Sequence, residues 1–368
     1  MSELLNDRRQ TIRWRLLTTV SAGALLASAC GTTQAADADR AAIWIELGAQ
    51  LEQTTGLGEP YRPPFSSEIV QDGLISPLGP QRALSQSFGG GAKVSFQPEN
   101  SDWVFSASIR YGRANGGSTI QQQTPGGRRQ VHLGTYSKYI TPTRVKFSGT
   151  QTRNEEAHTI LDFQSGKDIG LGLFKGGGTS TVGFGVRFAQ FTSKQTLTLN
   201  ADPDLYIPSN DKYSPFRHTY AVASHIERSF RGLGPSISWN ASALVIGDAE
   251  QGGIALDWGV NAAVLVGRQK VTGHHETVGT YYKSNPLQKY HFTSHIHRSG
   301  NPNRSRTVIV PNLGGFAGFS FRFPNAKVSL GYRGDFFFSA MDGGIDVARK
   351  ENRGFYGPFA SVSVGIGG

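Results

Sequence analysis

Residues 251–268 read QGGIALDWGVNAAVLVGR, and their side chains alternate between an apolar set and a small or polar set. The apolar set is Ile254, Leu256, Trp258, Val260, Ala262, Val264 and Val266. The positions between them include Ala255, Asp257, Gly259, Asn261, Ala263 and Gly267. A period of two over this length predicts a β-strand with one apolar face. Nine to eleven such residues span a bilayer when the strand is tilted by about 45°, so the segment predicts a membrane-spanning strand.

The same alternation recurs along the chain and predicts ten strands. Their apolar rows fall within residues 43–51, 92–96, 103–111, 157–173, 182–188, 233–239, 254–266, 317–323, 326–332 and 360–366. We therefore expect an all-β protein, a transmembrane antiparallel up-and-down β-barrel of about ten strands. A further hairpin near Val145 and Phe147 would raise the number to twelve.

Short and long connections alternate between these strands. Short turns are expected at 97–102, 174–180, 244–251 and 324–325, and long polar loops at 52–89, 113–156, 192–228, 269–306 and 340–355. Outer-membrane barrels have short periplasmic turns and long external loops. Both chain termini are therefore expected on the periplasmic side.

The first 35 residues have the pattern of an export signal, and the mature chain is expected to be one barrel domain, residues 36–368. Arginines between Arg8 and Arg15 precede a short apolar stretch, and small residues around Ala35 offer a cleavage point. The single cysteine, Cys30, lies in this region and is either discarded with the signal or acylated as in a lipoprotein. We expect no disulfide in the mature protein.

The composition fits an exported barrel and indicates its partners. Hydrophobic residues make up 38% of the 368 residues, and no apolar run approaches the twenty or so residues of a spanning helix. Removing residues 1–35 leaves 33 basic against 25 acidic residues, a net charge of +8. This charge suits contact with outer-membrane lipids and lipopolysaccharide phosphates, or attraction of small anions. We also expect the barrel insertion machinery as a partner and no nucleic acid, and oligomerisation stays open.

The two faces of the strands predict two sets of functional residues. The apolar parity should face lipid and carry an aromatic belt made of Trp103, Tyr111, Trp239, Trp258, Tyr332 and Phe323. The other parity should face the lumen, where charges avoid the cost of facing lipid. Its polar residues, a candidate constriction, are Glu46, Arg110, Asp162, Arg187, Asp257, Asn261, Arg333 and Asp335, with Lys93 and Lys327.

Four segments resemble the Legionella-type major outer membrane protein family of pore-forming proteins. They are EEAHTILDFQSGKDIGLGLF (155–174), VGFGVRFAQF (182–191), LDWGVNAAVLVGRQK (256–270) and KVSLGYRGDFFFSAMDGG (327–344). The early segment IWIELGAQLE (43–52) is similar to the first strand of that family. The resemblance implies a porin-like outer-membrane protein of the Gram-negative envelope that lets ions or small hydrophilic solutes diffuse passively.

The residues alone leave a second function open. Ten strands lie near the size at which side chains fill a barrel, so the lumen is either a narrow water-filled pore or plugged. The alternative function is a non-channel surface barrel, an adhesin or interaction protein that binds polyanions through its long basic loops. Loop 269–306 is the richest of these, with five histidines and three arginines.

We expect neither catalysis nor a bound metal or cofactor. The histidines of His291-x-x-x-His295-x-His297 have no acidic or cysteine partner at the spacing of a closed metal site. His158 and Asp162 would lie about 13 Å apart along one strand, too far for direct proton transfer. The glycine-rich stretches fall at turns and form no strand–loop–helix phosphate site.

Overall fold

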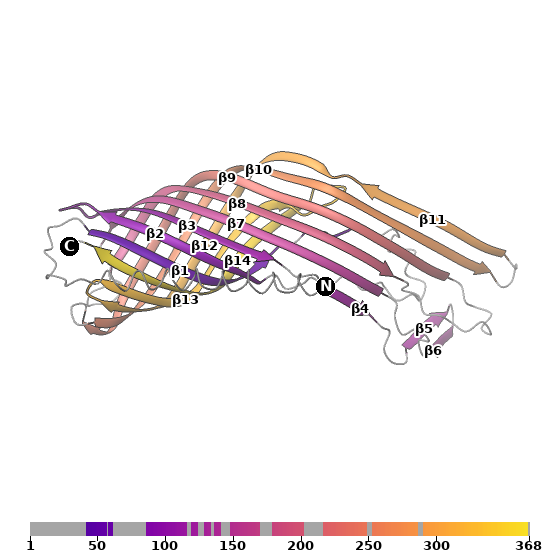
Figure 1. Ribbon diagram of the computed structural model, residues 1–368, viewed down its shortest axis with the longest axis horizontal. Helices are drawn as coiled ribbons and strands as arrows, with labels where there is room; N and C mark the ends of the chain where they lie inside the picture. The colour runs from indigo at the N-terminus through magenta and orange to yellow at the C-terminus, as the bar shows by residue number, and fades with distance from the viewer. Residues whose placement is uncertain are drawn as a thin grey trace, which may run out of the picture.

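The fold is a closed antiparallel β-barrel of ten strands, seen in a computed structural model that describes residues 42–56, 58–61, 86–115, 119–123, 129–133, 136–140, 148–169, 179–201, 216–248, 252–285 and 290–366. The barrel strands are β1 (Ala42–Thr55), β2 (Gln86–Gln97), β3 (Trp103–Asn115), β7 (Ser148–Asp168), β8 (Thr179–Ala201), β9 (Phe216–Asp248), β10 (Gly252–Asn285), β12 (Asn303–Phe323), β13 (Ala326–Asp342) and β14 (Lys350–Ile366). They pair in this order, and β14 closes the ring on β1 (Figure 1).

The remaining strands lie outside the ring. Strand β4 (Thr119–Gln123) pairs with β7, and β11 (Tyr290–Gly300) pairs with the far end of β10. Strands β5 (Arg129–Leu133) and β6 (Tyr136–Ile140) form a separate hairpin. No helix of the described residues is long and apolar enough to cross a membrane.

The predicted barrel and its ten strands are confirmed, and so is the assignment of the two faces on β10. Val260, Val264 and Val266 are about half exposed on the outer surface. Ala255, Asp257 and Leu265 are buried inside. From Ile254 to Val266 the outward apolar row rises roughly 30 Å, at about 3.3 Å per residue and a tilt near 40°, enough for an apolar band of about 25 Å.

The expected long loops are wrong in much of their length, because strands continue through them. Segment 192–228 belongs largely to β8 and β9, and segment 269–306 to β10, β11 and β12. Segment 340–355 contains only a short connection, 343–349. Polar residues occupy both faces of these extensions, so the alternation of apolar and polar residues that marks a lipid-facing strand is lost, although β-pairing continues. Figure 1 shows β7 to β11 extending well beyond the rest of the barrel.

On four neighbouring strands, the outward residues change from apolar to polar at the same register level, which marks the outer edge of the apolar band. Phe188, Leu233, Val266 and Ile309 are successive partners on β8, β9, β10 and β12. Two residues further along each strand, the outward partners are Gln190, Arg231, Arg268 and Thr307. The apolar surface therefore ends between these two rows, and the strand extensions lie beyond it.

Several sequence predictions fall outside the described residues. They are the export signal with Cys30, the possible hairpin near Val145 and Phe147, and most of the short turn 174–180. The short turns 98–102 and 324–325 lie at the same end of the barrel as Ile43 and Ile366, which are register partners.

Candidate functional site: the barrel lumen

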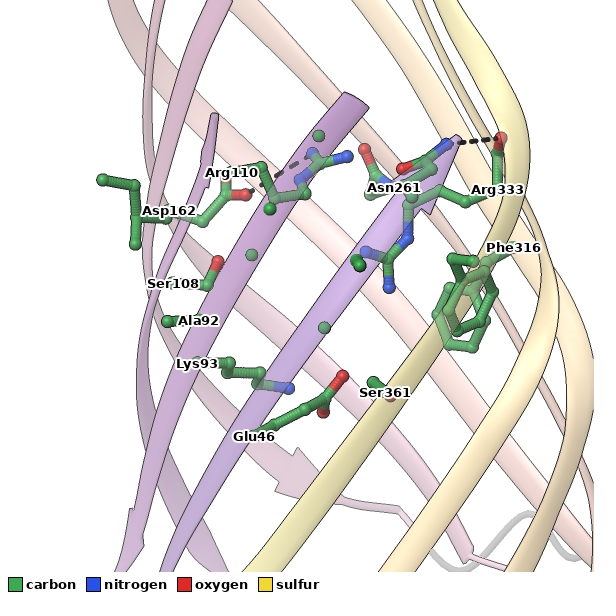
Figure 2. A pocket seen from close by; sticks show the side chains of 18 of the residues that line it. Glu46, Ala92, Lys93, Ser108, Arg110, Asp162, Asn261, Phe316, Arg333 and Ser361 are labelled. Carbon is green, nitrogen blue, oxygen red and sulfur yellow. Dashed lines mark hydrogen bonds and ion pairs between the residues drawn. The ribbon is translucent and has the colours of Figure 1, made fainter. Parts of the chain in front are cut away.

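The middle of the lumen holds a network of charged side chains that joins six strands. Arg187 on β8 donates from Nε and Nη2 to the two carboxylate oxygens of Asp162 on β7, at 2.6 and 3.1 Å. Its Nη1 donates to Asn261 Oδ1 on β10 at 2.6 Å and to the Asn312 side chain on β12. Arg110 on β3 donates to Asp335 on β13. Figure 2 shows Arg110, Asp162 and Asn261 converging from the wall.

A layer of phenylalanine rings fills the lumen next to this network, on the side away from the short turns, which the predicted topology makes the external side. Phe191 on β8 lies 4.6 Å from Phe337 on β13 and 5.2 Å from Phe355 on β14, centroid to centroid. Phe230 stacks on Phe191 at 5.6 Å. Strands β8 and β14 are five strands apart in either direction around the ring, so they lie opposite each other. The contact between Phe191 and Phe355 therefore spans the whole lumen.

The same layer is dry and closely packed. Phe191, Phe230 and Phe337 have no exposed surface, and Phe355 is 4% exposed. They belong to one buried cluster completed by Ile160, Ala189, Ala263, Leu265, Val310, Ala340 and Met341. Such packing leaves no aqueous passage through the described part of the lumen at this level.

A buried histidine–carboxylate contact and a buried ion pair lie next to the phenylalanine layer, on the side away from the charged network. His158 Nε2 lies 3.3 Å from Glu52 Oε2, and the His158 ring packs 4.0 Å from the Phe355 ring. Arg353 on β14 forms an ion pair with Glu156 on β7, which also accepts a hydrogen bond from Ser193 at 2.9 Å. Both contacts join strands that are not neighbours: two strands lie between β1 and β7, and three lie between β14 and β7.

The connection 343–349 folds over the external mouth. Gly343 accepts a hydrogen bond from the Glu59 backbone N–H at 2.7 Å, and Arg228 Nη2 donates to the Glu59 carbonyl at 2.6 Å. Ile345 is fully buried against Ile226 and Val271. Gly58 has a φ of +71°, and a Cβ there would lie 2.9 Å from Arg228 Cζ, so a side chain would disturb this closure.

Two residues of this external closure have shifted pKa values. Burial lowers the pKa of Arg228 to about 10, against the opposing pull of Asp342 and Glu59, so the guanidinium stays charged at neutral pH. Burial alone would raise the pKa of Asp342. Hydrogen bonds from the Arg349 and Gly344 backbone N–H groups and from Arg304 outweigh burial and hold the pKa below its ordinary value.

The half of the lumen next to the short turns, the end expected to face the periplasm, is open and polar. It contains two adjoining cavities of about 140 and 290 Å³, both lined by Glu46, Lys93 and Arg333. Asp257 forms ion pairs with Lys327 Nζ at 2.7 Å and with Arg322 Nη2 at 3.0 Å. We call this space, from the charged network to the short turns, the periplasmic vestibule.

The structure places the eight predicted lumen residues inside the barrel, in two groups. Arg110, Asp162, Arg187, Asn261 and Asp335 belong to the charged network. Glu46, Asp257 and Arg333 line the vestibule. Sequence reasoning missed the phenylalanine layer, although Phe191 and Phe337 have inward parity on their strands. Aromatic residues at inward positions were the available signal.

The six aromatic residues predicted as a belt lie at different heights on the outer face. Trp103 and Phe323 border short turns, and Tyr111 is the last outward apolar residue before Arg113. Trp239 donates its indole N–H to Ser180 Oγ at 2.9 Å, near the start of β8. Trp258 and Tyr332 share the register row through Ala317, halfway along the apolar row of β12, so these two lie mid-band and not at an edge.

No group of three His, Cys, Asp or Glu side chains capable of holding a metal ion occurs within the described ranges. In the external sheet, Glu276 lies 3.9 Å from His274 Nε2 and 3.7 Å from His297 Nδ1. His225 is the register partner of His274. These are exposed polar contacts on the surface of the strand extensions.

Three solved structures are similar to the chain at low identity and low TM-score. The chain is similar to the outer membrane protease OmpT from Escherichia coli, with 10% identity over 91% of this chain and 99% of that chain, at a TM-score of 0.41. It is also similar to the translocator domain of the autotransporter NalP from Neisseria meningitidis (10% identity, 98% and 96% covered, TM-score 0.26). The CymD monoaromatic hydrocarbon channel gives 8% identity, 89% and 90% covered, and a TM-score of 0.23.

At these identities the likeness concerns the fold alone. No protein-family model matches the chain, and no curated protein matches it. The resemblance to the Legionella-type major outer membrane protein family therefore stays a prediction.

Proposed function

We propose that the protein is a non-conducting outer-membrane barrel that presents a β-sheet at the cell surface and binds polyanions of its own outer leaflet. The contact between Phe191 and Phe355 across the lumen carries the non-conducting part of this proposal. A porin-like function would require the phenylalanine layer, the charged network and the connection 343–349 all to rearrange.

The outward face just beyond the apolar band supports the binding part of the proposal. Arg231 and Arg268 are register partners on β9 and β10, and Lys270 follows two residues beyond Arg268. All three are exposed, and among the described residues no carboxylate lies within 4 Å of their charged groups. Arg231 lies over the Phe188 ring at 5.3 Å, which holds its guanidinium close to the band edge.

This height is the level of lipid headgroups, so the chemistry that fits is the phosphate of lipopolysaccharide. Guanidinium and ammonium groups bind phosphate through charge-assisted hydrogen bonds. Ser229 and Thr307 are register neighbours that add hydroxyl groups, while Ser305 Oγ accepts a hydrogen bond from Arg268 Nε at 2.5 Å. Further from the band, Glu227 and Glu276 carry negative charge, and Lys194 pairs with Glu227 at 3.6 Å. Positive charge further out on the sheet is interspersed with carboxylates, whereas the rows next to the lipid carry Arg231, Arg268 and Lys270 together.

Binding of lipopolysaccharide to the folded protein tests the proposal. The triple variant Arg231→Gln, Arg268→Gln and Lys270→Gln removes the basic row, and each charge is worth about 1 kcal/mol at an anionic surface, so affinity should fall about 100-fold. A matched triple variant at Arg153, Lys194 and Arg298 removes equal charge higher on the sheet and should bind like the wild type. Dephosphorylated lipid A should bind neither protein tightly. Equal binding by the wild type and the first variant would contradict the proposal.

A further inference from the structure

Arg333 differs from the other arginines of the lumen core. Arg110 and Arg187 each contact carboxylates in the charged network. Arg333 makes no ion pair within 4 Å among the described residues, although it points into the lumen. Its guanidinium carbon lies 4.8 Å from the Phe359 ring centroid and 5.4 Å from the Phe316 ring centroid. Figure 2 shows Arg333 reaching inward with Phe316 beside it.

No described residue accepts a hydrogen bond from the Arg333 guanidinium, so within this part of the chain its donors are available. Aromatic contacts stabilise the charge through the faces of the guanidinium but accept no N–H hydrogen bond in its plane. The planar edge of an arginine matches two oxygens of a carboxylate or a phosphate. An arginine whose role was to tie the wall together would be expected to pair with a carboxylate, as Arg187 does with Asp162.

The vestibule around Arg333 carries an excess of positive charge. Outside the charged network, its four cations are Lys93, Arg322, Lys327 and Arg333, and its three carboxylates are Glu46, Glu52 and Asp257. Asp257 is shared by Arg322 and Lys327, and Lys93 stands opposite Glu46 in the β1–β2 register. The charged network next to it balances itself with two arginines and two aspartates. Excess charge inside a cavity with low-dielectric walls concentrates ions of the opposite sign.

The vestibule also has the size and the neutral donors of a small-ligand site. The two cavities of about 140 and 290 Å³ share Arg333 and Lys93, and their walls add Ser106, Asn240 and Ser361. The Ser238 hydroxyl, also in both walls, already donates to Gln164 Oε1 at 2.9 Å. The phenylalanine layer closes the external side, so a ligand enters from the periplasmic end only. We propose that the periplasmic vestibule is a dead-end binding site for a small oxyanion, a carboxylate or a phosphate, held by the edge of the Arg333 guanidinium with Lys93 as the second cation.

Oxyanion binding in the vestibule is independent of lipopolysaccharide binding, because the basic row lies on the opposite face of the wall and just beyond the apolar band. If lipopolysaccharide binding fails its test, oxyanion binding in the vestibule is unaffected, because the two are tested with different variants. The vestibule site is tested with inorganic phosphate and with succinate as probes, on folded protein in detergent micelles at constant ionic strength. The signal is the Nε–Hε resonance of Arg333 in nitrogen-15 spectra.

We expect a saturable shift of the Arg333 resonance with at least one probe, and the probe that saturates it identifies the oxyanion class. Binding measured by calorimetry should weaken at least tenfold in Arg333→Gln. Arg333→Lys keeps the charge but cannot chelate two oxygens, so it should bind more weakly than the wild type and better than Arg333→Gln. Arg153→Gln, an exposed arginine paired with Glu155 at 2.7 Å, should bind like the wild type.

Two results would overturn the proposal. One is a shift that grows linearly with both probes without saturating. The other is equal binding by the wild type and Arg333→Lys, which would mean that the probe is attracted by positive charge alone and is not held by the edge of the guanidinium. Heat-modifiable mobility on gels establishes that each variant is folded, and the lysine variant carries the test if Arg333→Gln does not fold.

Discussion

The substitution Phe191→Ala tests whether the lumen is a dry core. Phe191 has no exposed surface and contacts the rings of Phe230, Phe337 and Phe355. Removing a fully buried phenylalanine side chain loses its transfer free energy and leaves a cavity, which together cost about 3–5 kcal/mol. The free energy of unfolding should fall by that amount, measured by urea titration in lipid vesicles under reversible conditions.

Phe184→Ala is the matched control on the same strand. Phe184 is 60% exposed on the outer, lipid-facing surface. Its loss removes apolar area from the lipid contact without opening an internal cavity, so it should cost roughly 1–2 kcal/mol. If Phe191→Ala costs no more than Phe184→Ala, Phe191 faces water or a loose interior, and the reasoning that the lumen is filled is refuted.

Three further predictions test the faces, the external closure and the orientation. Val260→Arg points a charge at lipid and should lower the free energy of unfolding by about 2–4 kcal/mol. Ser106→Arg points into the vestibule, and this variant should insert normally. Equal loss of folded protein on gels for the two variants would mean that the faces are wrongly assigned. Because the folded-state pKa of Asp342 lies below its ordinary value of 3.8, its stabilisation of the connection 343–349 is present above that value and is lost as pH falls through the folded pKa. Asp342→Asn should therefore speed pepsin cleavage of this connection at pH 4 but not at the lowest pH, and equal rates at pH 4 would exclude the role. Ser299→Cys should react with an impermeant thiol reagent on intact cells and Asn100→Cys should not, and the reverse pattern would invert the barrel.

Local periodicity was enough to predict the barrel, because the alternation of apolar and polar side chains within each strand indicates which face meets lipid. Val260 and Asn261 differ by one position and occupy opposite faces of β10. The same parity placed Arg110 and Asp335 inside, although their mutual contact could not be foreseen. That contact depends on the register of five strands, which no single segment encodes.

The extensions and the closed lumen could not be predicted for a related reason. Beyond Arg268 the outward face of β10 is mostly polar, so its sequence resembles that of a loop. Pairing with β9 on one side, and with β12 and then β11 on the other, keeps it extended. Phe191 and Phe355 are 164 positions apart in the chain and meet because their strands lie opposite each other. Closure of a barrel interior is thus a property of the ring and not of any strand in it.

Conductance across a planar lipid bilayer tests the central claim most directly. The purified, folded protein, with its heat-modifiable mobility verified on gels, is added to the bilayer in 1 M salt, where steering by surface charge is largely screened. With the phenylalanine layer intact, we predict no single-channel steps above the baseline of the empty membrane. Steady, reproducible steps from the wild-type protein would contradict the closed lumen and favour the porin-like function.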